Sequence, residues 1–150
     1  MNFKEHAAAG AATGLVVAGG SYYMLPDPRL GPVYGLIALA GSLSPDIDTG
    51  SIPSRIFAWV GIAISFLLIH ENHPEAAAYI GIIYMAFSSD RHRGFTHKWI
   101  LPIACFMIGG VGIYYPDVFP IFTRLFWLIP FGLGLITHLI IDKIPPSKII

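Results

Sequence analysis

The sequence predicts an all-α protein: a multi-spanning transmembrane helical bundle of about six short helices, forming a single integral membrane domain over residues 1–150. The chain is 55% hydrophobic and 12% charged, whereas soluble domains carry about 25% charged residues. Its mean hydropathy is +0.66. The apolar segments are continuous rather than alternating, which argues against the strands of a membrane β-barrel. A bilayer would cover the surface that so few charges leave apolar.

The first three apolar segments end at turn-forming clusters of proline and charged residues. The first, about residues 3–24, is rich in alanine and ends before the turn PDPR at 26–29. The second, about residues 32–43, stops at the sequence SPD at 44–46. The third, about residues 53–69, ends at HENHP at 70–74.

The last three segments are bounded by polar or proline residues in the same way. The fourth covers about residues 75–87 and ends at SSDRHR, the fifth about residues 99–115, and the sixth about residues 120–141. A full membrane span needs about 20 residues. The second and fourth segments are shorter, so we expect them to cross a thinned region, to enter only partly, or to pack inside the bundle away from lipid.

Small residues recur in these segments. Gly10 and Gly14 form a Gly-x-x-x-Gly spacing, and further glycines follow at positions 109, 110, 112, 132 and 134. Missing side chains let helix backbones approach closely in membranes. We therefore expect these glycines to lie at helix–helix contacts.

If all six segments cross, both termini and the loops near 46–55 and 90–98 share one side of the membrane. That side holds seven of the nine basic residues, namely Lys4, Arg55, Arg91, Arg93, Lys98, Lys143 and Lys148, against Arg29 and Arg124 on the other. The positive-inside rule makes the richer side cytoplasmic. The sequence thus predicts an integral protein of the plasma (inner) membrane with both termini in the cytoplasm. Because basic and acidic residues number 9 each, nothing attracts the chain to nucleic acid.

Seven potential metal ligands gather on the same predicted side: His6, Asp46, Asp48, His92, His97, His138 and Asp142. Ionisable groups near membrane helices are costly unless they are paired, hydrated or bound to metal. His138 and Asp142 are spaced i, i+4 and should project from one helix face. Gly134, one turn earlier on that face, is expected to leave room for a ligand. His70 and His73 fall on the far side and are expected to belong to a solvated loop.

Imidazoles and carboxylates without a thiolate suit zinc, manganese or iron. We expect a divalent metal, with Zn²⁺ first and Mn²⁺ or Mg²⁺ as alternatives, and one or two ions. Arg93 would bind phosphate oxygens through its planar guanidinium. Each signal also has a simpler interpretation: His6 as an interfacial residue, His138 and Asp142 as a helix-surface hydrogen bond, Asp46 and Asp48 as a helix cap. Their convergence at one face favours a metal site.

The motifs resemble a known family. PDID at 45–48, HRGFTH at 92–97, HxxxD at 138–142 and HxxxG at 6–10 are similar to those of the YdjM-like family of LexA-regulated, membrane-bound metal-dependent hydrolases, over nearly the whole chain. The resemblance implies a multi-spanning inner-membrane protein whose His/Asp pattern is similar to that of zinc-dependent phospholipase C enzymes. It implies that the seven residues are ligands or near-ligands, and that Arg93 and Thr96 contact the substrate or support the ligands. Lys98 departs from the serine common at that position, which puts the substrate pocket in question.

The sequence therefore predicts a metal-dependent hydrolase acting at the cytoplasmic face on a phosphoester of a lipid or another membrane-associated substrate. Asp46, Asp48, Arg93 and Thr96 would be catalytic, with Asp46 or Asp48 a ligand or the proton acceptor. Membrane lipids are the expected partners, and a homo-oligomer is compatible with the sequence. The alternative is a non-catalytic membrane anchor or stress-response effector with a structural His/Asp site. A transporter is less favoured, because transport sites tend to lie near the bilayer midplane.

Overall fold

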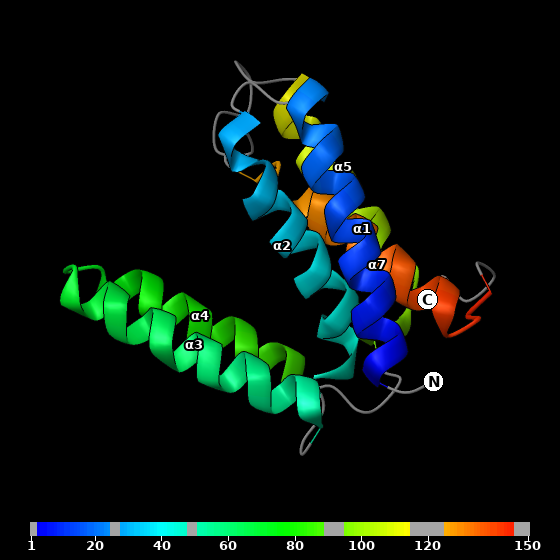
Figure 1. Cartoon of the computed structure of the whole chain (residues 1–150). Coiled ribbons are helices and arrows are strands. Elements are labelled where there is room, and N and C mark those ends of the chain that lie inside the picture. Colours follow the sequence, from blue (N-terminus) through cyan, green and yellow to red (C-terminus); the bar gives the residue numbers. More distant parts are fainter. Residues whose placement is uncertain (1–2, 25–27, 48–50, 89–94, 115–124, 146–150) are drawn as a thin grey trace. The chain divides into compact units, whose positions relative to one another are not determined.

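The computed structural model describes residues 3–24, 28–47, 51–88, 95–114 and 125–145. These residues form helices and turns and contain no strand, which confirms the all-α class. Six α-helices carry the labels of Figure 1: α1 (Phe3–Met24), α2 (Gly31–Leu43), α3 (Ile52–His70), α4 (Pro74–Ser88), α5 (Ile100–Tyr114) and α7 (Leu128–Ile141). Three 3₁₀ helices join them: η1 (Pro28–Leu30), η2 (Ser44–Asp46) and η3 (Phe95–His97).

Contacts divide the chain into two compact units, Met1–Leu43 with His97–Ile150, and Ser44–Thr96. The first unit contains α1, α2, α5 and α7, and is called the four-helix unit below. The second contains α3 and α4, and is called the hairpin unit. The expectation of one integral domain stays a prediction.

Glycines bring α1 and α2 together in the four-helix unit (Figure 1). A Cβ atom on Gly14 would lie 2.7 Å from the carbonyl oxygen of Gly35, and one on Gly35 would lie 2.6 Å from the carbonyl oxygen of Gly14. One on Gly10 would lie 2.7 Å from the hydroxyl oxygen of Ser42. Real Cβ atoms do not approach so closely, so the two antiparallel backbones pack through positions that only glycine allows.

The helix α7 packs against α2 and α5 in the same way. Cβ atoms on Gly41 and Gly134 would overlap the carbonyl oxygens of Phe131 and Ala38, respectively. A Cβ on Gly132 would lie 3.1 Å from the Cβ of Cys105 on α5. The close-packing prediction is therefore confirmed for these positions, but Gly134 was wrongly expected to leave room for a ligand, because the backbone of α2 fills that space.

The sixth apolar segment was expected to run from about residue 120 to residue 141. The helix α7 in this segment is shorter, Leu128–Ile141. Residues 125–127 form a turn, and α7 begins at Leu128 with Trp127 as its N-cap. Pro130 lies in the first turn of the helix, where the missing N–H breaks no helical hydrogen bond. Hydropathy alone could not mark this boundary, because the turn is as apolar as the helix.

The hairpin unit joins α3 to α4 through a tight turn. The N-cap of α3 is Ser51, whose hydroxyl accepts the backbone N–H of Ser54 at 3.0 Å and donates to the carbonyl oxygen of Asp46 at 2.7 Å. Asp46 is therefore not the N-cap of this helix, and Asp48 lies outside the described residues. The hydroxyl groups of Ser54 and Tyr84 lie 3.0 Å apart and join α3 to α4.

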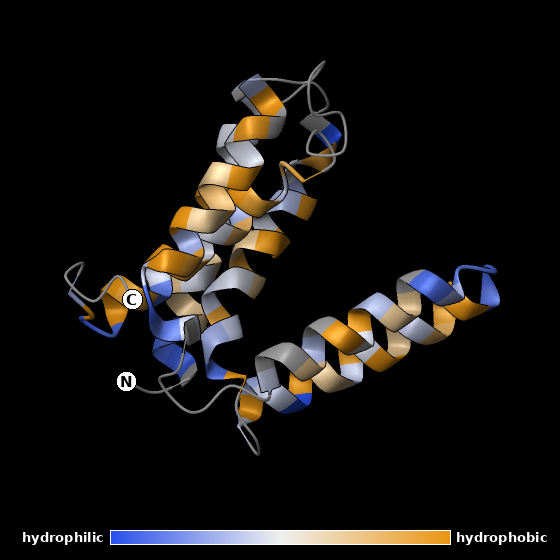
Figure 2. Cartoon of the chain, turned by 180° about the vertical axis from the view of Figure 1, so that it is seen from behind, coloured by the Kyte–Doolittle hydropathy of each residue, from blue (hydrophilic) through white to orange (hydrophobic). Residues whose placement is uncertain are grey.

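Among the described helices, α3 alone is both long and apolar enough to cross a membrane. Its 19 residues extend about 28 Å at 1.5 Å per residue, close to the hydrocarbon thickness of about 30 Å. Large apolar side chains such as Trp59 and Phe66 are more than 70% exposed on it. Figure 2 shows apolar residues along the helices of the hairpin and polar residues at its ends. The 13 residues of α2 and the 15 of α4 are short, as predicted.

Candidate metal centre

Four of the predicted ligands meet inside the four-helix unit. His6 lies one turn into α1, His97 is the last residue of η3, His138 lies in the last turn of α7, and Asp142 is the C-cap of that helix. The three histidines are buried, with His138 fully enclosed, while Asp142 is half-buried. Residues separated by more than 130 positions in the sequence are thus collected at one end of the unit.

The nitrogen and oxygen atoms that could bind an ion point toward one another. The Nε2 atom of His6 lies 3.1 Å from Oδ1 of Asp142, and Nε2 of His138 lies 3.5 Å from Oδ2. The Nε2 atom of His97 lies 3.8 Å from the same Oδ2 and 3.3 Å from Nε2 of His138. The rings of His6 and His138 stack with centroids 4.2 Å apart. The carboxylate of Asp142 is therefore the common neighbour of three imidazole nitrogens.

The end of α7 explains the position of Asp142. The N–H of Lys143 donates to the carbonyl of Ile140 at 3.0 Å, and the N–H of Ile144 donates to that of Leu139 at 2.9 Å. These two bonds form a Schellman motif, which requires a left-handed residue after the cap. Lys143 supplies it at φ 55°. The helix therefore continues just far enough for the i, i+4 pair to share one face, as predicted.

Ser42 on α2 is a part of this site that the sequence analysis did not identify. Its carbonyl oxygen lies 2.8 Å from Nδ1 of His138, and its hydroxyl donates to the carbonyl oxygen of His6 at 3.3 Å. Ser42 is fully buried. The sequence did contain a signal for Ser42, which is a polar residue in an apolar helix. Such residues seldom lack a polar partner in a membrane, so a contact with the site could have been expected.

The hydrogen bond to Ser42 determines which nitrogen of His138 carries a proton. A carbonyl oxygen can only accept a hydrogen bond, so Nδ1 of His138 must be the donor. In a neutral imidazole the other nitrogen, Nε2, then holds a lone pair. That lone pair lies 3.5 Å from a carboxylate oxygen of Asp142 and 3.3 Å from Nε2 of His97. A metal ion, a second proton on His138 or an N–H of His97 would each satisfy it.

The spacing of the donor atoms also fits a metal ion. Zinc binds imidazole nitrogen and carboxylate oxygen at about 2.0–2.2 Å in a tetrahedron, whose ligand atoms are then roughly 3.3–3.6 Å apart. The separations on Asp142 are 3.1, 3.5 and 3.8 Å, and the His138 to His97 separation is 3.3 Å. The donor atoms of His6, His138 and Asp142 all lie within 4.8 Å of one another. This buried His/Asp cluster could therefore hold a metal ion with small movements.

Comparison with known proteins identifies the family. Residues 1–149 match the YdjM inner membrane protein family. The chain belongs to this family. No curated protein and no solved structure matches the chain.

Membership confirms the resemblance and shows that the chain is an inner membrane protein. Three of the predicted site residues, Asp48, His92 and Arg93, lie outside the described residues. Asp46 is half-buried at the end of η2, and Thr96 is buried in η3; both fall in the unit Ser44–Thr96. The participation of these five residues in a metal or substrate site stays a prediction.

Proposed function

We propose that this protein is a membrane-embedded, metal-dependent hydrolase that cleaves a phosphoester of a lipid or another membrane-associated substrate at the cytoplasmic face. The observation that carries the proposal is the arrangement of His138, whose Nδ1–H is held by the carbonyl of Ser42 while Nε2 faces Asp142. A histidine fixed through one nitrogen presents the other for coordination, as in many metal sites. The chain belongs to a family of inner membrane proteins, so such a site would belong to a protein of that membrane.

The residues of the cluster have distinct roles in this proposal. His6, His97 and His138 would hold a divalent ion, Zn²⁺ first, through Nε2, and Asp142 would supply one or both oxygens and offset its charge. When bound, such an ion lowers the pKa of a coordinated water and polarises a phosphoryl oxygen.

The remaining predicted residues would act on the substrate. Arg93 would bind the phosphate oxygens with its planar fork, and Thr96 would orient them. Asp46 or Asp48 would be a further ligand or accept the proton of the attacking water. A second ion would be held through these carboxylates and His92.

The topology that we propose has six membrane crossings with both termini and the His/Asp cluster in the cytoplasm. Seven of the nine basic residues would then lie on that side, as the positive-inside rule requires. A cluster at headgroup depth would admit water from the cytoplasm and a lipid from the bilayer.

The test is an assay of the detergent-purified protein on phospholipids and polyprenyl phosphates, with Zn²⁺, Mn²⁺ or Mg²⁺ added. The His97→Ala variant should lose at least a hundredfold in kcat/KM, because it lacks one donor of the cluster. The matched control is His70→Ala, which removes the exposed histidine at the end of α3 and should retain full activity. Equal turnover of the His97→Ala variant and the wild type would exclude this mechanism.

A non-catalytic role is the second candidate, and one observation favours it. The carboxylate of Asp142 would also be satisfied by protons on the Nε2 atoms of His6, His97 and His138. Its contacts with His6 and His97 would then join α7 to α1 and η3 without metal. The protein would then serve as a membrane anchor or stress-response effector. A protein that binds no metal, and whose thermal unfolding is insensitive to chelators, would favour this candidate.

A further inference from the structure

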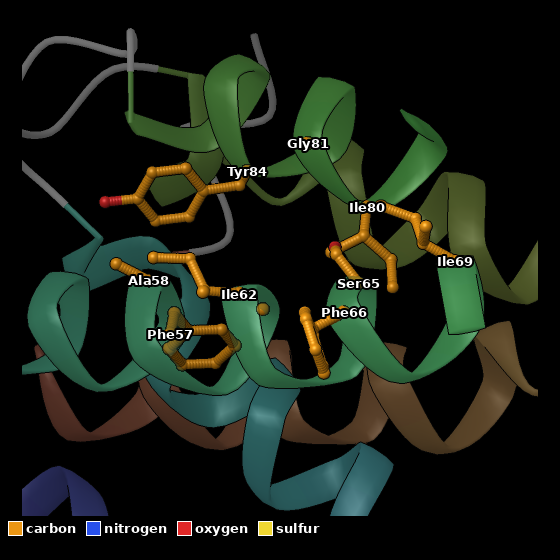
Figure 3. Close-up of a pocket in the computed structure, with 10 residues that line it drawn as sticks. Phe57, Ala58, Ile62, Ser65, Phe66, Ile69, Ile80, Gly81 and Tyr84 are labelled. Carbon is orange, nitrogen blue, oxygen red and sulfur yellow. The ribbon is translucent and has the colours of Figure 1, made fainter. Parts of the chain in front are cut away.

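A groove of about 400 Å³ runs along the hairpin unit between α3 and α4. Figure 3 shows Phe57 and Tyr84 at one end of it and Ile69 and Ile80 at the other. Apart from Ser65 and Tyr84, its lining residues are apolar or glycine. The volume falls in the range of sites for small ligands, and the lining offers too few polar partners to hold ordered water.

The helix that forms one wall indicates what surrounds the groove. The 19 residues of α3 are long and apolar enough to cross a membrane, and only 11% of its apolar window is buried. In an inner membrane protein, the medium around such a helix is lipid acyl chain. A Cβ atom added to Gly81 would meet nothing within 4 Å. The absence of a side chain at Gly81 therefore leaves part of the groove open.

Among the residues that the structure describes, the exposed charged side chains differ between the two ends of the hairpin helices. Arg55 is exposed and lies three residues before Ala58 and seven before Ile62, both in the groove wall. Residues with these spacings share one helix face. The hydroxyls of Ser54 and Tyr84 also meet at this end, 3.0 Å apart.

The opposite end, at the turn between the helices, carries the exposed carboxylates of Glu71 and Glu75. Carboxylates repel a phosphate, whereas a guanidinium binds one. The charge pattern therefore fits an amphipathic ligand whose anionic head lies at the Arg55 end and whose apolar chain extends toward Ile69.

We propose that the groove between α3 and α4 binds one acyl chain of an anionic phospholipid whose phosphate pairs with Arg55. The chain occupies the space beside Gly81 and Ile62, and the lipid comes from the leaflet on the Arg55 side. This binding site belongs to the hairpin unit alone and does not depend on the proposed hydrolase activity.

Native mass spectrometry of the detergent-purified full chain tests this, with dioleoyl phosphatidylglycerol and dioleoyl phosphatidylcholine as probes. The wild type should retain one phosphatidylglycerol and bind it about fivefold more tightly than phosphatidylcholine, the contribution expected of one basic residue. Gly81→Leu should weaken binding of both lipids by more than tenfold, because each displaced methylene contributes about fourfold. Gly19→Leu is the matched control, since its added side chain also meets nothing within 4 Å but lies on α1. Arg55→Gln should remove the preference for phosphatidylglycerol without weakening phosphatidylcholine.

Ser65→Leu narrows the same groove from α3. This variant replaces Gly81→Leu in the test if Gly81→Leu does not fold. Weakened lipid binding in either groove variant but not in Gly19→Leu supports the proposal. Unchanged binding in a folded groove variant overturns the groove as the site, and so does a dimer of the chain that excludes lipid. A preference for phosphatidylglycerol that survives in Arg55→Gln overturns the assignment of the headgroup.

Discussion

Replacement of Gly134 by alanine should damage both the fold and the metal centre, because one methyl group must enter the contact between α7 and α2. The new Cβ would lie 2.7 Å from the backbone nitrogen of Ser42 and would overlap the carbonyl of Ala38. An ordinary contact is at least about 3.4 Å, so α2 must move by at least about 0.7 Å to clear the nitrogen of Ser42 and by more to clear the carbonyl of Ala38. The bond from His138 to the carbonyl of Ser42, now 2.8 Å, crosses the same interface and would lengthen to at least about 3.5 Å, beyond useful hydrogen-bonding distance.

The expected cost is about 1–3 kcal/mol of unfolding free energy from overpacking, with about 1 kcal/mol more for the lost hydrogen bond. The better helix propensity of alanine offsets roughly 0.5–1 kcal/mol of this. Gly110→Ala is the control, because its Cβ would meet nothing within 4 Å and should stabilise α5 by the same 0.5–1 kcal/mol. Unfolding in mixed micelles measures both variants, and elemental analysis measures their metal. The reasoning fails if Gly134→Ala is as stable as Gly110→Ala and retains as much metal.

Three further substitutions test the account of the helix ends and contacts. Lys143→Gly should raise stability by about 0.5–1 kcal/mol, because glycine adopts the left-handed conformation that lysine holds at φ 55° without a steric penalty; an unchanged or lower melting temperature would contradict this. Ser51→Ala should cost about 1 kcal/mol and speed hydrogen exchange of the Ser54 amide, since that N–H loses the cap that it donates to; unaltered exchange would argue against the cap. Thr13→Val should cost roughly 0.6 kcal/mol, the average for hydrogen bonds between membrane helices, because it removes the 2.8 Å bond to Thr137; stability equal to that of the wild type would exclude a contribution from this bond.

Much of the helical organisation could be predicted from the positions of proline and charged residues. The clusters after residues 24, 43 and 70 end α1, α2 and α3 within a few residues of the expected boundaries. The start of α7 could not be predicted in this way, because the turn at 125–127 is apolar and Pro130 is tolerated in a first turn. The multi-spanning arrangement stays a proposal, since helix length and apolarity mark α3 alone among the described helices.

Part of the candidate site could also be predicted from the sequence, and part could not. The i, i+4 spacing was enough to predict that His138 and Asp142 share a face, and the predicted topology brought His6 and His97 to the same end. Sequence spacing could not distinguish a glycine that leaves space for a ligand from one that admits a helix backbone, so Gly134 was misjudged. The role of Ser42 was missed because its carbonyl, the group that fixes His138, is common to every residue.

The central claim is that His6, His97, His138 and Asp142 bind a divalent metal. Its most direct test is elemental analysis of the protein purified in detergent without chelators, compared with His138→Ala and with His73→Ala, which removes an exposed histidine between α3 and α4. We predict at least one divalent ion per chain in the wild type and in His73→Ala, and its loss in His138→Ala. A metal-free wild type, or a folded His138→Ala variant with the full metal content, would contradict the account.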